Sequence, residues 1–379
     1  MDTLADNNYH DHSGDKPNKW IVVIILIISL AGIIYSLSKP VGKDVVSGRV
    51  LKVLSEKEIT QEIGEKSEIL KEQDLLVEIT EGSERKEINV LNDYEPVAIG
   101  DKIFLSQSLF GDSEWSMANI SRTRDLMILF AFFIILVILT SGWKGFYSLV
   151  GLLFTFAVIF IFMLPQILKG VSPVFIGISG ASLILIPTLY LSYGFNKKSV
   201  AAFLGIIIAL IFVGFISNYF VNSLNFTGAN EAFLYLNMAS TNSINVMGLL
   251  IAGIIIAAVG VLDDVAAIQS SVVFSLARAN KDLRGLKLFK EAMYVGKDHI
   301  SAVVNTLVLA YTGASLPVIL LLSIQKMPLD YLISLEIVAE EITRTLISSS
   351  GLLLAVPLTT IIATIMISKN YQAESNCNV

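Results

Sequence analysis

The stretch that decides the fold runs from Asn245 to Pro317. It reads NVMGLLIAGIIIAAVGVLDDVAAIQSSVVFSLARAN, then KDLRGLKLFKEAMYVGKDH, then ISAVVNTLVLAYTGASLP. Two long apolar segments flank a basic one, and two acids, Asp263 and Asp264, interrupt the first apolar segment. A charged group inside a segment long enough to cross a bilayer is costly, so it usually has a function or a partner.

The composition indicates that the whole chain is a membrane protein. Of its 379 residues 54% are hydrophobic and only 16% are charged, with a mean hydropathy of +0.69, whereas soluble domains carry about a quarter charged residues. This predicts an integral protein in contact with the lipid bilayer. The net charge of −6 gives no expectation of nucleic-acid binding. The single cysteine, Cys377, excludes an internal disulfide and a cysteine-clustered metal site.

Several blocks of the sequence resemble one known family. VGVLDDVA, SLARANKDL and NTLVLAYTGASLP, together with KIFLSQS, WKGFYSL and AEEITRTLISSSGLLLAVPLT, are similar to those of the YibE/F-like multi-pass bacterial membrane proteins. The resemblance covers nearly the whole chain, and it implies a multi-pass fold in a bacterial cell membrane. It implies no particular biochemical activity.

Long uncharged runs predict an all-α polytopic membrane protein with about eight transmembrane helices. Because about 20 residues cross the hydrocarbon layer, the candidate spans are Trp20–Leu37, Leu126–Thr140, Gly145–Leu168, Val174–Phe195, Ser199–Val221, Asn245–Ala277, Ile300–Gln325 and Thr345–Ser368. The chain then divides into a cytoplasmic tail (1–19), a first transmembrane helix (20–38), a β-domain (39–124), a seven-helix transmembrane domain (125–368) and a cytoplasmic C-terminal tail (369–379).

The residues between the first two spans predict a small extracytoplasmic β-barrel, OB-like in character. Apolar and polar residues alternate in Val46–Leu54, Leu75–Thr80, Lys86–Leu91 and Lys102–Ser106, which is typical of half-buried strands. About five such strands suit a small barrel or sandwich. Trp115 and Tyr94 are the domain's only Trp and Tyr and make no stacking platform, so we expect a structural or partner-docking role before small-ligand binding.

The distribution of Lys and Arg predicts the orientation in the membrane. With the N-terminus inside, the cytoplasmic segments carry twelve of these residues and the opposite short loops only three, Lys169, Lys326 and Arg344. Both termini are then cytoplasmic. The basic segment 281–297 alternates basic and apolar residues at nearly helical spacing, which predicts an amphipathic helix on the anionic inner leaflet.

The acid pair leaves two interpretations open. A helix that begins at Asn245 reaches Asp263 after about 27 Å, near the cytoplasmic interface, where Asp263 or Asp264 caps a new helix. Alternatively the helix is broken at 262–264, and the acids lie at membrane depth, as ion-holding residues do in transporters. A polar stripe of Asp264, Ser271, Ser275 and Arg278 then lines a cavity. Asp264 is the stronger candidate, because it is the acid of the Asp-Val-Ala motif in the family that the sequence resembles.

Two further groups complete the candidate site residues. Asn305 is an amide inside a predicted span, so it needs a partner on another helix, either for a structural hydrogen bond or as part of a polar pathway with Asp263, Asp264 and Ser271. Glu336, Glu340 and Arg344 share one helix face at four-residue spacing, which favours an ion pair. They form a candidate outer vestibule.

The sequence carries no signature of catalysis. It has no GxxxxGK[ST] phosphate loop and no HExxH zinc motif, so we expect no enzymatic activity, no cofactor and no metal. The leading hypothesis is a permease or exporter-like transporter of a small solute or ion. The alternative is a non-transporting membrane scaffold or assembly factor, whose extracytoplasmic β-domain binds a membrane or extracytoplasmic protein partner.

Overall fold

The computed structural model of the chain describes residues 19–37, 45–63, 66–81, 84–93, 95–107, 115–228, 245–324 and 327–377. They form two compact units, of which one comprises Leu37–Gly142 and the other the remaining helices. The predicted N-terminal tail lies almost wholly outside the described residues, as does the loop 229–244.

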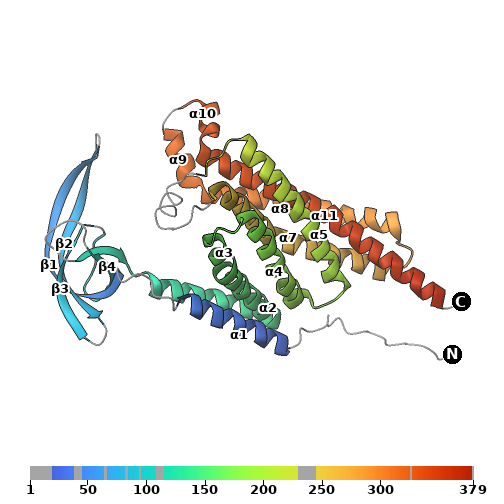
Figure 1. Cartoon of the computed structure of the whole chain (residues 1–379), viewed down its shortest axis with the longest axis horizontal. Helices are drawn as coiled ribbons and strands as arrows, with labels where there is room; N and C mark the ends of the chain where they lie inside the picture. The colour runs from blue at the N-terminus through green and yellow to red at the C-terminus, as the bar shows by residue number, and fades with distance from the viewer. Residues whose placement is uncertain are drawn as a thin grey trace, which may run out of the picture. The chain divides into compact units, whose positions relative to one another are not determined.

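The first unit contains a closed five-stranded barrel (Figure 1). Its strands are β1 (Val45–Ile63), β2 (Lys66–Glu81), β3 (Glu84–Asn92), β4 (Lys102–Gln107) and β5 (Trp115–Ile120). They follow the order β1-β2-β3-β5-β4, and all neighbours are antiparallel except β3 and β5. The small β-barrel predicted between the first two spans is therefore confirmed. The fifth strand, which begins at Trp115, was not among the alternating segments identified in the sequence.

The barrel core follows from the alternation of apolar residues along the strands. Leu75, Val77 and Ile79 of β2 all point inward and are at most 1% exposed, because residues two apart share one face of a strand. Gly48 in β1 leaves the space that Val77 occupies, since a Cβ there would lie 2.5 Å from Val77 Cγ1. Each fully buried Leu or Ile contributes about 1.5–3 kcal/mol, so this core can stabilise the barrel without the helices.

Two buried amides secure the segment between β3 and β4. Asn92 Nδ2 donates to Gln73 Oε1 at 3.1 Å and to the Glu95 carbonyl at 2.9 Å, and Val97 N donates to Gln73 Oε1 at 2.9 Å.

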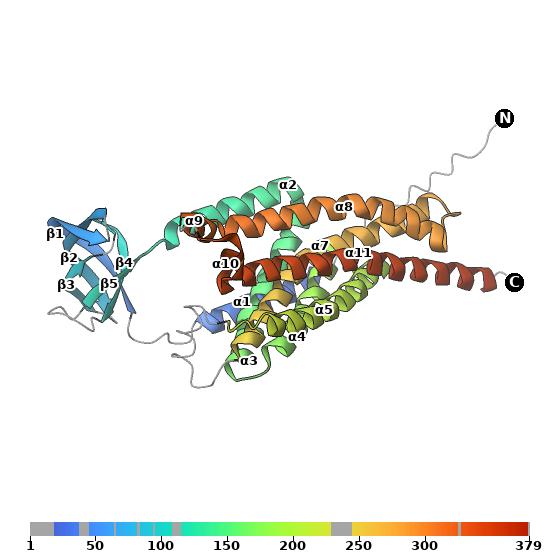
Figure 2. The same cartoon turned by 90° about the horizontal axis from the view of Figure 1, so that it is seen from above.

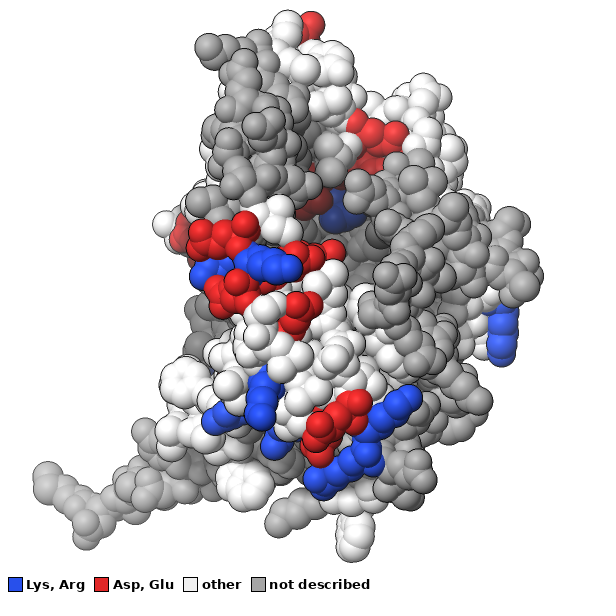
Figure 3. All heavy atoms as spheres, turned by 90° about the vertical axis from the view of Figure 1, so that its left-hand side faces the viewer, with Lys and Arg blue, Asp and Glu red and all other residues white. Residues whose placement is uncertain are grey.

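Outside the core the charges are mixed, and Figure 3 shows acidic and basic side chains interspersed on one face of the molecule. The exposed pair Lys71 Nζ–Glu56 Oε1, at 2.7 Å, lowers the pKa of Glu56 through its hydrogen bond.

The rest of the chain is helical. Its helices are α1 (Lys19–Leu37), α2 (Thr123–Ala157), the π-helix η1 (Val158–Met163), α3 (Leu164–Leu168), α4 (Pro173–Tyr193), α5 (Lys197–Ser223), α7 (Val246–Ala279), α8 (Gly285–Ala314), α9 (Leu316–Ile324), α10 (Leu329–Ser334) and α11 (Glu336–Cys377). Helix α11 thus continues into the residues that the sequence predicted to be a tail.

Five helical stretches among the described residues are long and apolar enough to cross a bilayer. They are Thr123–Leu168, Pro173–Leu191, Lys197–Ser223, Val246–Ala279 and Glu336–Ser368, and Trp20–Ile33 is a shorter apolar helix. The predicted count of eight is not confirmed. Two predicted spans fall within the first stretch, on either side of Gly142, whose φ of 55° departs from helical geometry. The predicted span Ile300–Gln325 is divided between α8 and α9 at Ser315.

Helix α7 is the centre of the bundle. It contacts α4, α5, α8 and α11, and Figures 1 and 2 show α5, α7, α8 and α11 running alongside one another. Small residues permit the close approach, as expected where lipid provides no hydrophobic force between helices. At Gly205 of α5 a Cβ would collide with the fully buried Thr359 of α11.

One buried amide joins three of these helices. Gln269 of α7, which is 2% exposed, donates from Nε2 to the Ala292 carbonyl of α8 at 3.0 Å and to Thr360 Oγ1 of α11 at 2.8 Å. Gly296 of α8 lies against the same amide, because a Cβ there would be 2.8 Å from Gln269 Oε1. The position of α8 on the bundle therefore depends on Gln269.

The barrel core predicts an autonomous folding unit. A fragment of residues 41–121 should be soluble and should unfold cooperatively with a β-type circular dichroism spectrum. Leu75→Ala should lower its free energy of unfolding by about 2–5 kcal/mol, whereas Leu54→Ala, at a site 52% exposed, should change it by about 0.5 kcal/mol or less. Equal effects of the two substitutions, measured by urea titration, would contradict this core.

The amide junction predicts an energetic coupling between α7 and α11. In a double-mutant cycle of Gln269→Leu and Thr360→Val, we expect a coupling free energy of about 0.5–1.7 kcal/mol, the range of hydrogen bonds between membrane helices. The measurement is unfolding of the purified protein in mixed micelles. Ser275→Ala, at an exposed position of α7, serves as the control, and additive effects of Gln269→Leu and Thr360→Val would refute the coupling.

Candidate functional site

Helix α7 runs without interruption through the acid pair. It is helical from Val246 to Ala279, and its N-cap, Asn245, accepts a hydrogen bond from Gly248 N at 2.9 Å. Both sequence-based interpretations are therefore wrong in one respect, because the helix neither breaks at residues 262–264 nor begins anew after the acids. Groups on neighbouring helices face the two carboxylates, so no free helix end is needed to hold them.

Asp263 faces α4. The Thr188 hydroxyl lies close to its carboxylate but donates to the Ile184 and Leu185 carbonyls, at 3.0 and 3.2 Å. Tyr193 interacts electrostatically with both Asp264 and Asp263. One oxygen of Asp263, Oδ1, is buried and has no hydrogen-bond partner in the part of the chain that the structure describes. An acid in this environment is costly as an isolated charge.

Asp264 faces a different helix. Successive residues of a helix are about 100° apart, so Asp264 is exposed while Asp263 is half-buried. His299 of α8 interacts electrostatically with the Asp264 carboxylate. The Nε2 atom of His299 is buried and, within the described ranges, has no hydrogen-bond partner.

These groups together form a polar site within the apolar bundle. Asp263, Asp264 and His299 come from two helices, and Thr188 and Tyr193 come from a third. Two buried atoms without partners, Asp263 Oδ1 and His299 Nε2, can each bind a proton, and the carboxylate can also bind a cation. No group of three or more His, Cys, Asp or Glu suited to a metal ion occurs among the described residues.

The predicted polar stripe of α7 lies on the outer face of the bundle. Asp264, Ser275 and Arg278 are exposed and Ser271 is half-buried. The polar residues that do face the bundle are Gln269 and Ser270, whose Oγ donates to the Lys198 carbonyl at 2.8 Å. Sequence reasoning missed Gln269, although an amide in the apolar run VAAIQSSVV was a usable signal.

Asn305 is not buried, contrary to the prediction. It is exposed on α8, whereas Leu307 is the one buried residue in the second half of that helix. The reason is the rotation of α8, which directs Leu307 toward the bundle and Asn305 away from it. An amide on this outer face contacts lipid unless another helix covers it.

The basic segment 281–297 is only partly what the sequence predicted. It is helical from Gly285, but the same helix continues to Ala314. The buried face of its first half, Leu288, Ala292 and Gly296, packs on the chain's own helices. Lys287, Lys290 and Lys297 remain exposed and are available to anionic headgroups, so contact with the inner leaflet stays a prediction.

Glu336 lies apart from the other two residues of the predicted outer vestibule. Glu336 binds the end of the segment after α5, accepting from Thr227 Oγ1 at 2.9 Å and Gly228 N at 2.7 Å. Arg344 pairs with Glu341, with Nη1 and Oε2 at 3.0 Å, so the ion pair expected from the four-residue spacing is wrong. Its partner is the acid three residues earlier.

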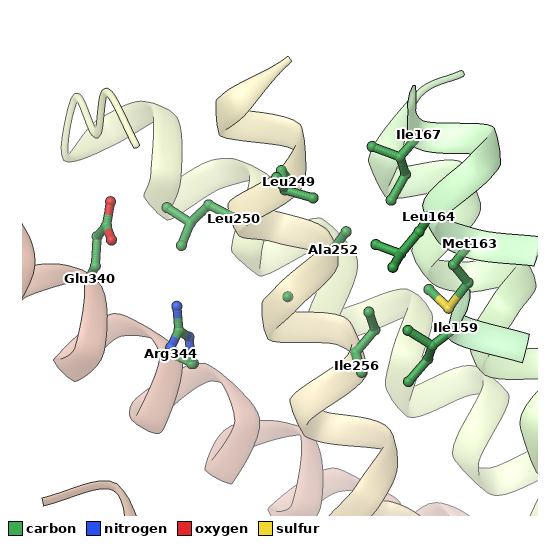
Figure 4. A pocket seen from close by; sticks show the side chains of 11 residues that line it. Ile159, Met163, Leu164, Ile167, Leu249, Leu250, Ala252, Ile256, Glu340 and Arg344 are labelled. Atoms are coloured by element: carbon green, nitrogen blue, oxygen red, sulfur yellow. The ribbon is translucent and has the colours of Figure 1, made fainter. Parts of the chain in front are cut away.

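Glu340 and Arg344 line a cavity of about 260 Å³ beside α7. Figure 4 shows the two side chains on α11, on one side of α7, with the apolar side chains of η1 and α3 on the other. The remaining lining residues are Ile159, Met163, Leu164, Ile167, Leu249, Leu250, Ala252, Gly253 and Ile256.

Comparison with known proteins identifies the family of the chain. The sequence model of the YibE/F-like proteins matches residues 129–369, which include every residue of the polar site and of the cavity. The match leaves the β-barrel outside its range. No curated protein and no solved structure is significantly similar to the chain. Since the match covers well over half of the sequence, the chain belongs to the YibE/F-like family.

Proposed function

We propose that the protein is a permease or exporter-like transporter, and that its polar site on α7 takes up a proton or a small cation. The observation that carries the proposal is the buried Oδ1 of Asp263, which has no partner among the described residues. An isolated carboxylate in an apolar bundle costs several kcal/mol, on the order of 2.5–3.5 kcal/mol in membrane insertion. Binding a proton or a cation removes most of that cost.

The surroundings of the acid support a directed uptake. Asp264 is exposed, whereas Asp263 and His299 are half-buried, so a proton or a cation can reach Asp264 first. The sequence favoured Asp264, but Asp263 is the more buried of the two acids. Asp263 is therefore the stronger candidate for the group that binds the proton or cation. The hydroxyl of Thr188 lies beside its carboxylate.

The proposal includes a topology in a bacterial cell membrane. Eight spans, with both termini cytoplasmic and the β-barrel outside, agree with the distribution of Lys and Arg. In this topology the cytoplasmic side holds the half of α7 that follows the acids, the basic half of α8 and the end of α11. The length of α11 supports this placement. Helix α11, with 42 residues, is about 63 Å long and exceeds the roughly 30 Å of hydrocarbon.

One observation favours the alternative, a scaffold or assembly factor. Asn305 and the adjacent Thr306 are exposed on α8, in a helix half without charged residues, and a membrane partner would satisfy the amide. The two functions predict opposite results in a deletion strain. A transporter requires Asp263 and tolerates Asn305→Leu, whereas a scaffold tolerates Asp263→Asn and requires Asn305.

The polar site predicts a reactive carboxylic acid. Dicyclohexylcarbodiimide, an apolar reagent that modifies protonated carboxyls, should label Asp263 in the purified protein, and mass spectrometry should detect the adduct on its peptide. Asp263→Asn should remove the adduct, while Asp330→Asn, at an exposed acid of α10, should not. In reconstituted vesicles that contain a pH-sensitive dye, Asp263→Asn should abolish proton entry under an imposed potential, and Asp264→Asn should slow it. Wild-type rates in the Asp263→Asn protein would exclude this site from transport.

The orientation predicts a pattern of thiol labelling. In a chain with Cys377→Ser, a cysteine at Ser67 should react with an impermeant maleimide on intact cells, and a cysteine at Lys287 should react only after permeabilisation. The unsubstituted chain, whose single cysteine is Cys377, is a separate control, because Cys377 should also need permeabilisation. Labelling of Lys287→Cys but not of Ser67→Cys on intact cells would invert the topology.

A further inference from the structure

The cavity beside α7 is lined by a buried acid. Glu340 is only 8% exposed, and within the described parts of the chain no hydrogen bond or salt bridge reaches its carboxylate. Arg344 interacts electrostatically with it, but the guanidinium group forms its salt bridge with Glu341, at 3.0 Å. Glu336 and Glu341 also act on Glu340, so three acids share this one base and the described charge around Glu340 is net negative.

The rest of the lining is apolar and open. Nine of its eleven residues are aliphatic, Met or Gly, and its volume of about 260 Å³ far exceeds the roughly 10–15 Å³ that one water needs. The π-helix η1 supplies Ile159 and Met163 to this wall, and such irregular turns frequently occur at functional sites. At Gly253 a Cβ would meet no atom within 4 Å, so the absence of a side chain keeps the cavity open.

From this combination we infer that the cavity binds a lipophilic cation, a molecule with an apolar body and a single amine or quaternary ammonium group. The ammonium group neutralises Glu340, and the apolar body contacts Leu249, Ile256 and Ile159. The Arg344 Nε atom is buried, and among the described residues it has no acceptor. It can donate a hydrogen bond to a neutral oxygen of the ligand.

The inference goes beyond the proposed function, because equilibrium binding in this cavity requires neither a gradient nor Asp263. The probe is radiolabelled benzyltrimethylammonium, dialysed to equilibrium against the full-length protein in phosphatidylcholine nanodiscs, with empty nanodiscs as the blank. We expect saturable binding with one site per chain. Phenylacetate, an anion of similar size, should show none, and binding of phenylacetate in place of the cation would overturn the inference in favour of an anion site at Arg344.

Substitutions in the cavity test whether the cation binds there. Glu340→Gln should weaken the affinity about 30-fold or more, as expected when a buried charge loses its partner. Gly253→Leu should fill the cavity and abolish saturable binding, and Gly253→Ala should weaken it if the Leu variant does not fold. Gly260→Leu is the matched control, because a Cβ at Gly260 also meets open space while Gly260 does not line the cavity.

Each remaining outcome is decisive. No saturable binding by the wild type, or unchanged affinity in Glu340→Gln or in both Gly253 variants, would overturn the inference. Asp263→Asn should retain wild-type affinity. If the cation does not bind while Asp263→Asn abolishes proton entry, only the inference about the cavity is contradicted. If the cation binds while Asp263→Asn leaves proton entry unchanged, only the proposed transport function is contradicted.

Discussion

The structure depends on the requirement that polar groups inside a membrane protein be satisfied by the protein itself. Helix α7 has this requirement in its most demanding form, because a buried amide, a buried serine and two acids lie in a mostly apolar helix that contacts four others. The amide and the serine are satisfied. Gln269 binds α8 and α11, and Ser270 binds the start of α5. These contacts fix the rotation of α7 about its axis, and thereby the direction in which each acid points.

That rotation separates structural polar groups from candidate functional ones. Gln269 has a partner on each side, so its hydrogen bonds are sufficient to explain its presence. Asp263 and Glu340 are different. Asp263 has a buried carboxylate oxygen without a partner among the described residues, and Glu340 is buried with no hydrogen bond or salt bridge to its carboxylate in that part of the chain. The two acids lie on different helices and in different surroundings, one beside polar groups of α4 and the other in an apolar cavity. A proton or small ion suits the first, and a larger cation suits the second.

Much of this architecture could be predicted from the sequence, but the partners could not. Alternation of apolar residues predicted the barrel, and uncharged runs predicted α4, α5, α7 and α11, because each signal is local. The strand at Trp115 was missed because its alternation is limited to its two buried residues, Trp115 and Met117. The acids were expected either to cap a new helix or to lie at a break between two helices, since a local argument cannot include Thr188 or His299 on other helices. Asn305 was expected to be buried because it lies inside a predicted span. The rotation of α8, which turns Leu307 toward the bundle and Asn305 away from it, could not be predicted from the sequence.

The close contacts of the bundle have a mechanical consequence. Gly205 against Thr359 and Gln269 against Thr360 lock α5, α7 and α11 together, so sliding any of these helices would create steric overlap or break a buried hydrogen bond. The second half of α8 has no such lock, because Leu307 is its only buried residue. A conformational change of this protein would therefore move the second half of α8 relative to α5, α7 and α11, which stay fixed to one another. Ala292 and Gly296 would form the fixed end of the moving part.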